Sequence, residues 1–232
     1  MDAVMRGKRE RKPGARLEAI IELIGQCNNI YDVGCDHGYM SLELVKRGLA
    51  KRIKFSDISA PALEKAFLNA QESGLLEKAS FRVADGLEGE SPGEGDAVCI
   101  SGMGGIAVAE ILERAPLLQS KTVVQPNTEI AFLRRALQKM GYGIDDERMV
   151  FDNGRFYQVI KLSAGEMQLS KAEELLGPVL LRQKPEILGR YVQRQIMLLE
   201  RALEGAKDDP QDSVPILSEL KIMKEAKSWL AK

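Results

Sequence analysis

Acidic residues and glycines lie at the end of the first predicted strand, in a pattern that could hold a small charged ligand. Asp32 lies near the end of the strand predicted over Ile30–Val33, and the turn after this strand contains Gly34, Asp36 and Gly38. Glycines at a strand end let the backbone approach a ligand closely. A dinucleotide site would read GxGxxG, whereas acids here would repel a pyrophosphate and suit a cationic ammonium and sulfonium. The pattern favours S-adenosylmethionine over NAD, with a purely structural turn as the alternative.

Two further acids follow the next two predicted strands. Asp57 ends the strand Arg52–Ser56, and Asp85 follows the strand Phe81–Ala84. Asp57 could accept both ribose hydroxyl hydrogens and Asp85 the adenine amino hydrogen; the alternatives are a helix cap before Pro61 and a plain turn. Because parallel strand ends converge on one crevice, the three acids together indicate a nucleoside cofactor site. Its expected residues are Asp32, Gly34, Cys35, Gly38, Asp57, Ile58, Asp85 and Gly86.

Glycines and amides follow the fourth and fifth predicted strands. Asp96–Ser101 runs into Gly102-Met103-Gly104-Gly105, and Thr122–Gln125 runs into Pro126-Asn127. So many glycines suggest that a flat group lies against bare backbone, which is where a methyltransferase presents its target base. The alternatives are a tight strand-to-helix turn at the glycines and capping of the next helix by Asn127.

The elements that must position these residues alternate between strand and helix. Apolar residues from Leu17 to Ile24 recur at helical spacing and end at Gly25. Further helices are predicted over Tyr39–Arg47, Pro61–Ser73, Ile106–Arg114 and Ile130–Met140.

The alternation then gives way to a hairpin. Two strand-like runs, Glu147–Phe151 and Phe156–Leu162, are joined by Asp152-Asn153-Gly154, and Asn-Gly between such runs is a strong hairpin signal. The pattern predicts an α/β fold with a Rossmann-like sheet that ends in an antiparallel hairpin, as in class I methyltransferases. Dinucleotide dehydrogenases usually finish with a parallel strand instead.

The rest of the chain is helical in pattern and carries one of two basic clusters. Asp208-Asp209-Pro210 divides it, which predicts a small helical appendage, with an antiparallel helix pair as one form. We therefore expect a basic arm over residues 1–15, a methyltransferase domain over 16–162 and the appendage over 163–232. Both clusters could attract phosphates, the alternative being a solvated tail and helix face. They comprise Arg6, Lys8, Arg9, Arg11, Lys12 and Arg16, and then Arg182, Lys184, Arg190, Arg194 and Arg201.

Composition excludes several classes of protein. The 232 residues carry a net charge of −1, and no apolar run approaches the length that crosses a bilayer. The N-terminus lacks the apolar stretch of a signal peptide. Three separated cysteines and a single histidine make a zinc site or a disulfide framework improbable. We expect a cytoplasmic protein with reduced thiols, no metal and no membrane partner.

Four motifs in order resemble one family. DVGCDHGY at 32–39, DGL at 85–87, GMGG at 102–105 and QPN at 125–127 resemble the bacterial tRNA (adenine(22)-N1)-methyltransferases, often called TrmK. The resemblance covers roughly residues 16–162, and the combination of DVGCDHGY with GMGG is highly specific. The family also carries a C-terminal coiled-coil appendage, while the segment before Arg16 is longer and more basic here than is typical.

The resemblance implies transfer of a methyl group from S-adenosylmethionine to N1 of an adenine in tRNA. Neutral adenine N1 has a free lone pair, so the enzyme must chiefly unstack and orient the base. Asp36 would stabilise the cationic product, Tyr39 would stack on the base and His37 would hydrogen-bond it. Core packing of Tyr39 and turn hydrogen bonding by His37 are the alternatives. The expected tRNA contacts are Gly102, Met103, Gly104, Gly105, Asn127, Arg182, Lys184, Arg190 and Arg194.

Three other functions remain open from the sequence. A methyltransferase of the same fold could act on another RNA position or on a small molecule. An NAD oxidoreductase and a cofactor-binding RNA chaperone without catalysis are less favoured.

Overall fold

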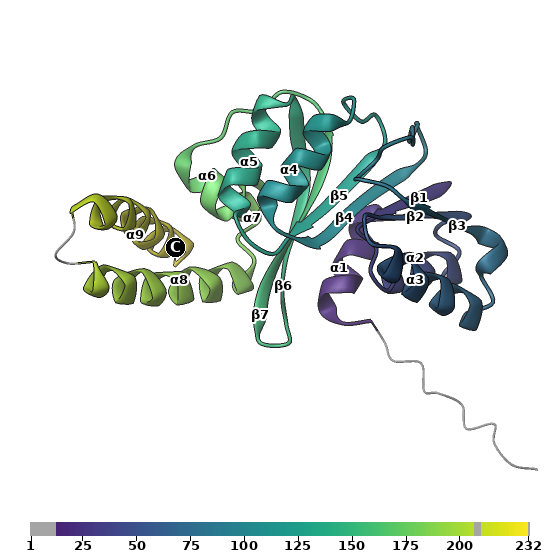
Figure 1. Cartoon of the computed structure of the whole chain (residues 1–232). Coiled ribbons are helices and arrows are strands. Elements are labelled where there is room, and N and C mark those ends of the chain that lie inside the picture. The colour runs from purple at the N-terminus through teal and green to yellow at the C-terminus, as the bar shows by residue number, and fades with distance from the viewer. Residues whose placement is uncertain (1–12, 207–209, 232) are drawn as a thin grey trace, which may run out of the picture.

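The strands form a mixed sheet that sets the direction of each loop in the candidate site. A computed structural model describes residues 13–206 and 210–231. Seven strands lie in the order β3-β2-β1-β4-β5-β7-β6, with β1 to β5 parallel and the last two antiparallel (Figure 1). Their bounds are β1 Asn29–Val33, β2 Arg52–Asp57, β3 Ala79–Val83, β4 Ala97–Met103, β5 Lys121–Pro126, β6 Tyr142–Asp152 and β7 Arg155–Ala164.

Helices cover both faces of the parallel strands. The first three helices pack on one face and the next two on the other (Figure 1). Successive strand residues alternate between these two cores: Ala97 and Cys99 of β4 face one, and Val98 and Ile100 face the other. Coverage on both faces explains the unbroken apolar run with which β4 begins, Ala97 to Ile100. The helices are α1 Ala15–Ile24, α2 Tyr39–Lys46, α3 Ala60–Glu72, α4 Gly105–Arg114 and α5 Ile130–Lys139, with a 3-10 turn at Leu76–Lys78.

The predicted α/β alternation is confirmed, and the bounds of β1 to β5 and α2 to α5 agree with prediction to within two residues. The last two strands are longer than predicted. β6 begins at Tyr142, well before Glu147, because the register shifts between Ile144 and Asp146 and breaks the period-two pattern.

The predicted hairpin turn is also confirmed. Asn153 and Gly154 both have positive φ, 46° and 79°, as a two-residue hairpin requires. The tip reaches past the carboxyl end of β5 and lies between α1 and α8 (Figure 1). There Asp152 Oδ2 accepts the backbone N–H of Arg16 at 3.2 Å. This bond supplies a cap that Gly14, which has no side chain, cannot provide to α1.

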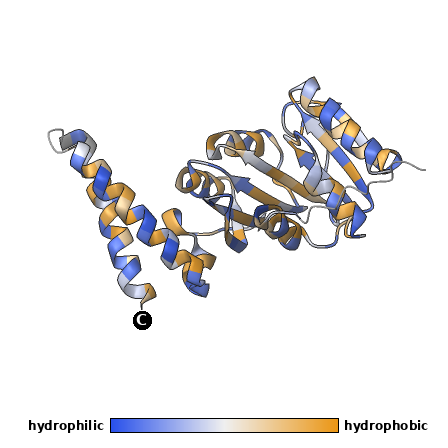
Figure 2. Cartoon of the chain, turned by 90° about the horizontal axis from the view of Figure 1, so that it is seen from below, coloured by the Kyte–Doolittle hydropathy of each residue, from blue (hydrophilic) through white to orange (hydrophobic). Residues whose placement is uncertain are grey.

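The C-terminal segment forms short helices and then a long helix pair. The predicted antiparallel pair is α8 and α9, which lie side by side, and Lys224 Nζ lies 2.8 Å from Glu200 Oε1 between them (Figure 1). Apolar and polar residues are mixed along both helices, and the strands of the sheet carry both kinds of residue (Figure 2). Residues 1–12 and 207–209, which hold most of the basic arm and Asp208-Asp209, lie outside the described residues. The bounds are α6 Lys171–Leu176, α7 Pro178–Gln183, α8 Glu186–Gly205 and α9 Pro210–Leu230.

A buried ion pair joins this segment to the sheet. Arg134 of α5 and Glu147 of β6 have fully buried side chains, with Nη2 and Oε1 2.7 Å apart. Arg134 Nη1 also donates to the Glu174 carbonyl, while Glu147 Oε2 accepts the backbone N–H groups of Val179 and Leu180. The pair therefore satisfies backbone groups of α6 and α7 and sets where the appendage begins.

Removing one partner of this pair should destabilise the protein strongly. Arg134→Met leaves Glu147 charged, buried and unpaired, which should lower the free energy of unfolding by about 3–5 kcal/mol. Arg135→Met is the matched control: the Arg135 side chain is 44% exposed beside Glu174, so the loss should stay below about 1 kcal/mol. Urea unfolding measures both, and equal losses in the two variants would contradict this role of the pair.

Candidate functional site

The carboxyl edge of the sheet carries the predicted site residues. β1 pairs with β2 on one side and β4 on the other, all parallel. The helix after β1 packs on one face and the helix after β4 on the opposite face. Such a switch point leaves a crevice outside the strand ends, where open α/β sheets bind ligands.

The loop after β1 has the backbone conformation that glycine allows. Gly34 and Gly38 have φ of 69° and 68°. A Cβ on Gly34 would collide with the thioether methyl of Met103, and one on Gly38 would lie 2.6 Å from the Phe55 ring. Packing against Phe55 alone explains Gly38, in line with the structural-turn alternative. Gly34 faces Met103 across the ends of β1 and β4, inside the predicted site.

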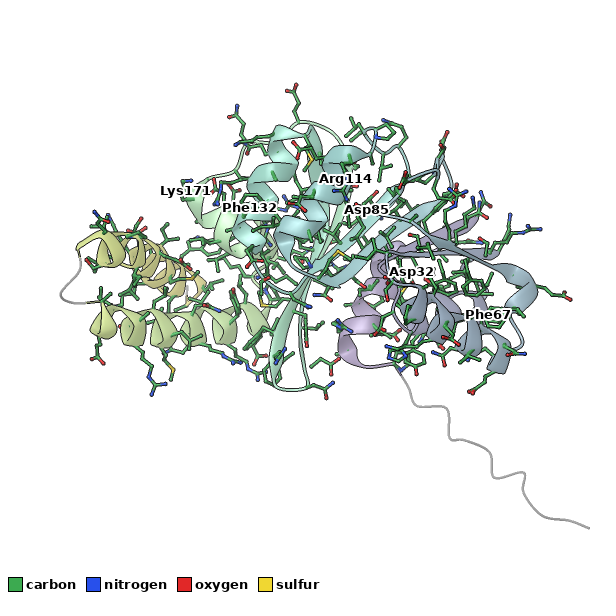
Figure 3. The ribbon with its side chains drawn as sticks, viewed as in Figure 1. Asp32, Phe67, Asp85, Arg114, Phe132 and Lys171 are labelled. Carbon is green, nitrogen blue, oxygen red and sulfur yellow. The ribbon has the colours of Figure 1, made fainter. Side chains whose placement is uncertain are left out.

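Asp32 is buried beneath this loop (Figure 3). Its Oδ2 accepts a hydrogen bond from Ser41 Oγ at 2.7 Å. Burial raises the pKa of the Asp32 carboxyl to about 7, with the Ser41 bond lowering it and the charge of Asp57 raising it further. Asp32 is thus an acid whose charge changes near neutral pH. Because the side chain is buried, it would act on a ligand mainly through the electric field of its charge.

At the end of β2, Asp57 is half-buried and Ile58 is exposed. Asp57 Oδ1 accepts the backbone N–H of Ser59 at 2.9 Å, whereas the N-cap of α3 is Ser59, whose side chain accepts from Ala62 N. The helix-capping alternative for Asp57 is therefore wrong. Ile58 is 73% exposed, which provides an apolar surface next to a carboxylate.

Asp85 lies against α4. Its Oδ1 is 2.7 Å from Nη2 of Arg114, and the two side chains lie close together (Figure 3). The next residue, Gly86, has a φ of 67° and its carbonyl accepts the Ser56 hydroxyl. A cavity of about 770 Å³ extends from Asp85 along α4, past Ile111 to residues 115–119. Of the predicted cofactor residues, Asp85 alone lines it.

This edge fits a nucleoside that carries a cationic group. The carboxylates of Asp57 and Asp85 can accept hydroxyl and amino hydrogens, and Ile58 can pack against a flat ring. Asp32 and the close backbone at Gly34 suit an ammonium.

Asp36, His37 and Tyr39 form an exposed group after β1. The His37 and Tyr39 rings are stacked, with centroids 5.3 Å apart, and His37 Nε2 lies 3.5 Å from Asp36 Oδ2. Tyr39 is 57% exposed, so the core-packing alternative is wrong. Lys65 Nζ lies 3.0 Å from Asp36 Oδ1, a neighbour that sequence reasoning missed. Lys65 therefore compensates part of the Asp36 charge before any substrate binds.

The glycines after β4 have separate roles. A Cβ on Gly105 would lie 2.6 Å from the Glu129 carbonyl, so the tight-turn alternative explains this residue. A Cβ on Gly104 would point at Thr128 and Glu129. Gly102 is exposed with a φ of 85°, and it is the glycine here that leaves bare backbone at the edge.

The amides after β5 join the ends of β4 and β5. Gln125 Nε2 donates to Asn127 Oδ1 at 3.2 Å, and Asn127 Nδ2 donates to the Gly102 carbonyl at 2.6 Å. The N-cap of α5 is Glu129, so the capping alternative for Asn127 is wrong. Gln125 Oε1 in turn accepts from Arg16 Nη1 at 3.0 Å. Sequence reasoning counted Arg16 in the basic cluster and missed it as a site residue.

The appendage cations fall into two places. Arg190 and Arg194 lie over the rings of Phe151 and Phe156 of the hairpin, at 5.5 and 5.8 Å, and Arg194 Nη1 donates to the Gly154 carbonyl. Lys184 instead lies 3.7 Å over the Trp229 ring of α9. Arg182 is exposed. The structure therefore brings Arg190 and Arg194 to the hairpin but keeps Lys184 apart from them.

Cys27, Cys35 and Cys99 are free and buried. Burial raises the pKa of all three thiols, that of Cys27 to about 11, so none is an activated nucleophile. Within residues 13–206 and 210–231, no three His, Cys, Asp or Glu side chains gather as metal ligands, and no helix is long and apolar enough to span a membrane.

Comparison with known proteins identifies the family. The family model of a methyltransferase domain matches residues 14–160. A tRNA (adenine(22)-N1)-methyltransferase from Bacillus subtilis is 31% identical over 184 residues, which cover 75% of this chain and 77% of the relative. The chain belongs to the tRNA (adenine(22)-N1)-methyltransferase family.

Solved structures of similar proteins agree with this family and fold. The crystal structure of the Bacillus subtilis tRNA methyltransferase TrmK has a TM-score of 0.83 at 26% identity, covering 93% of this chain and 99% of that one. A Streptococcus pneumoniae protein described as a candidate for the same activity was crystallised with S-adenosyl-L-methionine. It has a TM-score of 0.80 at 29% identity, covering 91% of this chain and 98% of that one.

The buried acid predicts that cofactor binding depends on pH. If ionised Asp32 attracts the cofactor ammonium, binding should release a proton from any protonated Asp32. S-adenosylhomocysteine should therefore bind more tightly as the pH rises from about 6 to about 7.5, levelling off above the Asp32 pKa. Calorimetry measures the affinities.

Two variants test this assignment. Asp32→Asn should bind more weakly at the upper pH and lose the pH dependence. Ser41→Ala removes a hydrogen bond that lowers the Asp32 pKa, so its midpoint should move to higher pH. The same pH dependence in Asp32→Asn as in the wild type would contradict the role of Asp32.

Proposed function

We propose that this protein transfers the methyl group of S-adenosylmethionine to N1 of adenine 22 in tRNA. The observation that carries the proposal is the switch point at β1, where parallel pairing turns the ends of β1, β2, β3 and β4, with their acids and glycines, to one edge of the sheet. The relative from Bacillus subtilis, a tRNA (adenine(22)-N1)-methyltransferase, supports the choice of acceptor. We also propose that the reaction takes place in the cytoplasm, since its proposed substrate is tRNA.

The proposed cofactor residues divide by chemistry. The cofactor, when bound, supplies an electrophilic methyl group on a sulfonium. Asp57 accepts the ribose hydroxyls, Asp85 accepts the adenine amino hydrogen and Ile58 packs against the ring. Asp32 supplies negative charge to the ammonium, and Gly34 lets the backbone approach. The S-adenosyl-L-methionine complex of the Streptococcus pneumoniae relative supports this cofactor. Cys35, Gly38 and Gly86 shape the two loops.

The proposed acceptor side needs position more than proton transfer. An unpaired adenine offers its N1 lone pair directly, so no strong base is required. Tyr39, stacked on His37 and exposed, is available to a second ring. Asp36 can offset the charge that develops on the methylated base, although Lys65 already compensates part of its own. Bare backbone at Gly102, held by Asn127, provides the flat surface.

We further propose that residues 16–162 carry out the transfer and that the appendage, residues 163–232, binds the tRNA. Arg190 and Arg194 support this proposal because they are exposed and lie beside the hairpin, whose tip extends past the carboxyl edge of the sheet, where the crevice lies. None of the ion pairs found in the described part of the chain includes either residue. Arg182 and Lys184 would extend the contact along the appendage.

Loss of the Asp57 side chain should weaken cofactor binding and leave the fold intact. Asp57→Ala removes the paired ribose hydrogen bonds, which should cost about 1.5–3 kcal/mol, or roughly tenfold or more in affinity for S-adenosylhomocysteine. Calorimetry measures this change. Asp145→Ala, an exposed acid at the other end of the sheet, is the control and should bind as the wild type does. Unchanged affinity in Asp57→Ala would remove the ribose assignment.

Neutralising Arg190 and Arg194, the two cations of α8 beside the hairpin, should weaken the binding of tRNA whatever its nucleotide sequence. If Arg190 and Arg194 contact phosphates, each change to Gln should reduce the slope of log affinity against log salt by about 1. Fluorescence anisotropy with tRNA measures both quantities. Arg52→Gln, exposed at the amino end of β2, is the control. An unchanged slope in the double variant would mean that the appendage does not hold tRNA here.

Point variants test tRNA binding by the appendage better than a truncation at Ser163 does. Such a truncation would remove the backbone N–H groups of Val179 and Leu180, which hydrogen-bond the buried Glu147. The sheet itself would then be destabilised.

A further inference from the structure

Arg16 places a guanidinium at the edge where β4 and β5 end. It lies in the first turn of α1, and its Nη1 donates to Gln125 Oε1 at 3.0 Å. Its Cζ lies 5.3 Å from the centre of the Tyr157 ring. Nη1 is also the atom nearest to where a Cβ on Gly102 would stand, at 3.9 Å. The cation therefore borders the bare backbone of the crevice.

The charge of Arg16 has no partner among the described residues. No ion pair found within 13–206 and 210–231 includes it, and the nearby Asp152 accepts the backbone N–H of Arg16. A guanidinium has five N–H donors, and the bond to Gln125 uses one of them. A half-buried cation with unused donors has lost part of its hydration without a compensating anion. Such a group is suited to bind one.

The neighbours of Arg16 hold the guanidinium in place. Gln125 is fully buried, and its Nε2 donates to the Pro126 carbonyl and to Asn127 Oδ1. These bonds orient Oε1 toward Arg16. Tyr157 packs against the cation from the hairpin. Because few rotamers remain open, a ligand that meets this guanidinium pays little entropy to order it.

We propose that Arg16 binds an oxyanion of a substrate at the edge where the methyl group is transferred. The inference rests on the proposed function, under which two oxyanions come to this edge. One is the carboxylate of the methionine portion of the cofactor, and the other is a phosphate of the target nucleotide. Both present two oxygens that a guanidinium can bind in a bidentate manner.

Three probes distinguish these sources in Arg16→Met, which keeps a long apolar stem beside Tyr157. S-adenosylhomocysteine carries the carboxylate, whereas 5′-methylthioadenosine has the same nucleoside without it; calorimetry measures both. Anisotropy with tRNA over a range of salt reports phosphate contacts. Arg52→Met is the control, since Arg52 is exposed at the opposite end of the sheet.

Each source predicts a separate result. If Arg16 binds the carboxylate, Arg16→Met should bind S-adenosylhomocysteine roughly tenfold or more weakly and methylthioadenosine as before. If it binds a phosphate, both nucleosides should bind normally, while tRNA binding weakens and its salt slope falls by about 1. Arg16→Lys keeps the charge without the bidentate geometry and should give an intermediate affinity for the same ligand.

Normal binding of all three probes by Arg16→Met would overturn the proposal. If that variant does not fold, wild-type affinities in Arg16→Lys would overturn it instead. Failure of the proposed function is a separate outcome. A wild-type protein that transfers no methyl group to tRNA would refute that function, while the two nucleoside measurements would still report whether Arg16 binds a carboxylate.

Discussion

The site depends on one constraint, the parallel pairing of β1 with both β2 and β4. This pairing turns the loops after three strands to the same edge, while the helices that follow β1 and β4 leave on opposite faces. A crevice results without any special loop. The chemistry then depends on the residues at the strand ends: a buried acid at Asp32, a half-buried acid at Asp57, an exposed acid at Asp85, and bare backbone at Gly102.

The hairpin extends this edge toward the appendage. Its Asp152 caps α1, which holds Arg16 at the crevice, and its Gly154 carbonyl accepts from Arg194 of α8. On the far side, the buried pair of Arg134 and Glu147 holds α6 and α7 against the sheet. The proposed transfer site and the proposed tRNA contacts thus share one element, the hairpin, which can place a bound RNA relative to the cofactor.

The sequence predicts the fold well, and it also places the acids at strand ends, because both follow local rules. Apolar runs mark the strands, Asn153-Gly154 marks the hairpin, and acids at strand ends converge by topology. It fails where contacts join residues far apart in the chain. Lys65 reaches Asp36 from α3, Arg16 reaches Gln125 from α1, and the Glu129 carbonyl explains Gly105. No spacing in the sequence signals such pairs, since they depend on how helices pack on the sheet.

The most direct test of this account is the identity of the modified base. Unmodified tRNA incubated with the protein and S-adenosylmethionine should yield N1-methyladenosine on mass spectrometry of its nucleosides, and tRNA with guanine at position 22 should yield almost none. N6-methyladenosine or N1-methylguanosine as the main product would contradict the proposed acceptor. No methylated nucleoside at all, from a protein that binds S-adenosylhomocysteine, would contradict the proposal of tRNA methylation itself.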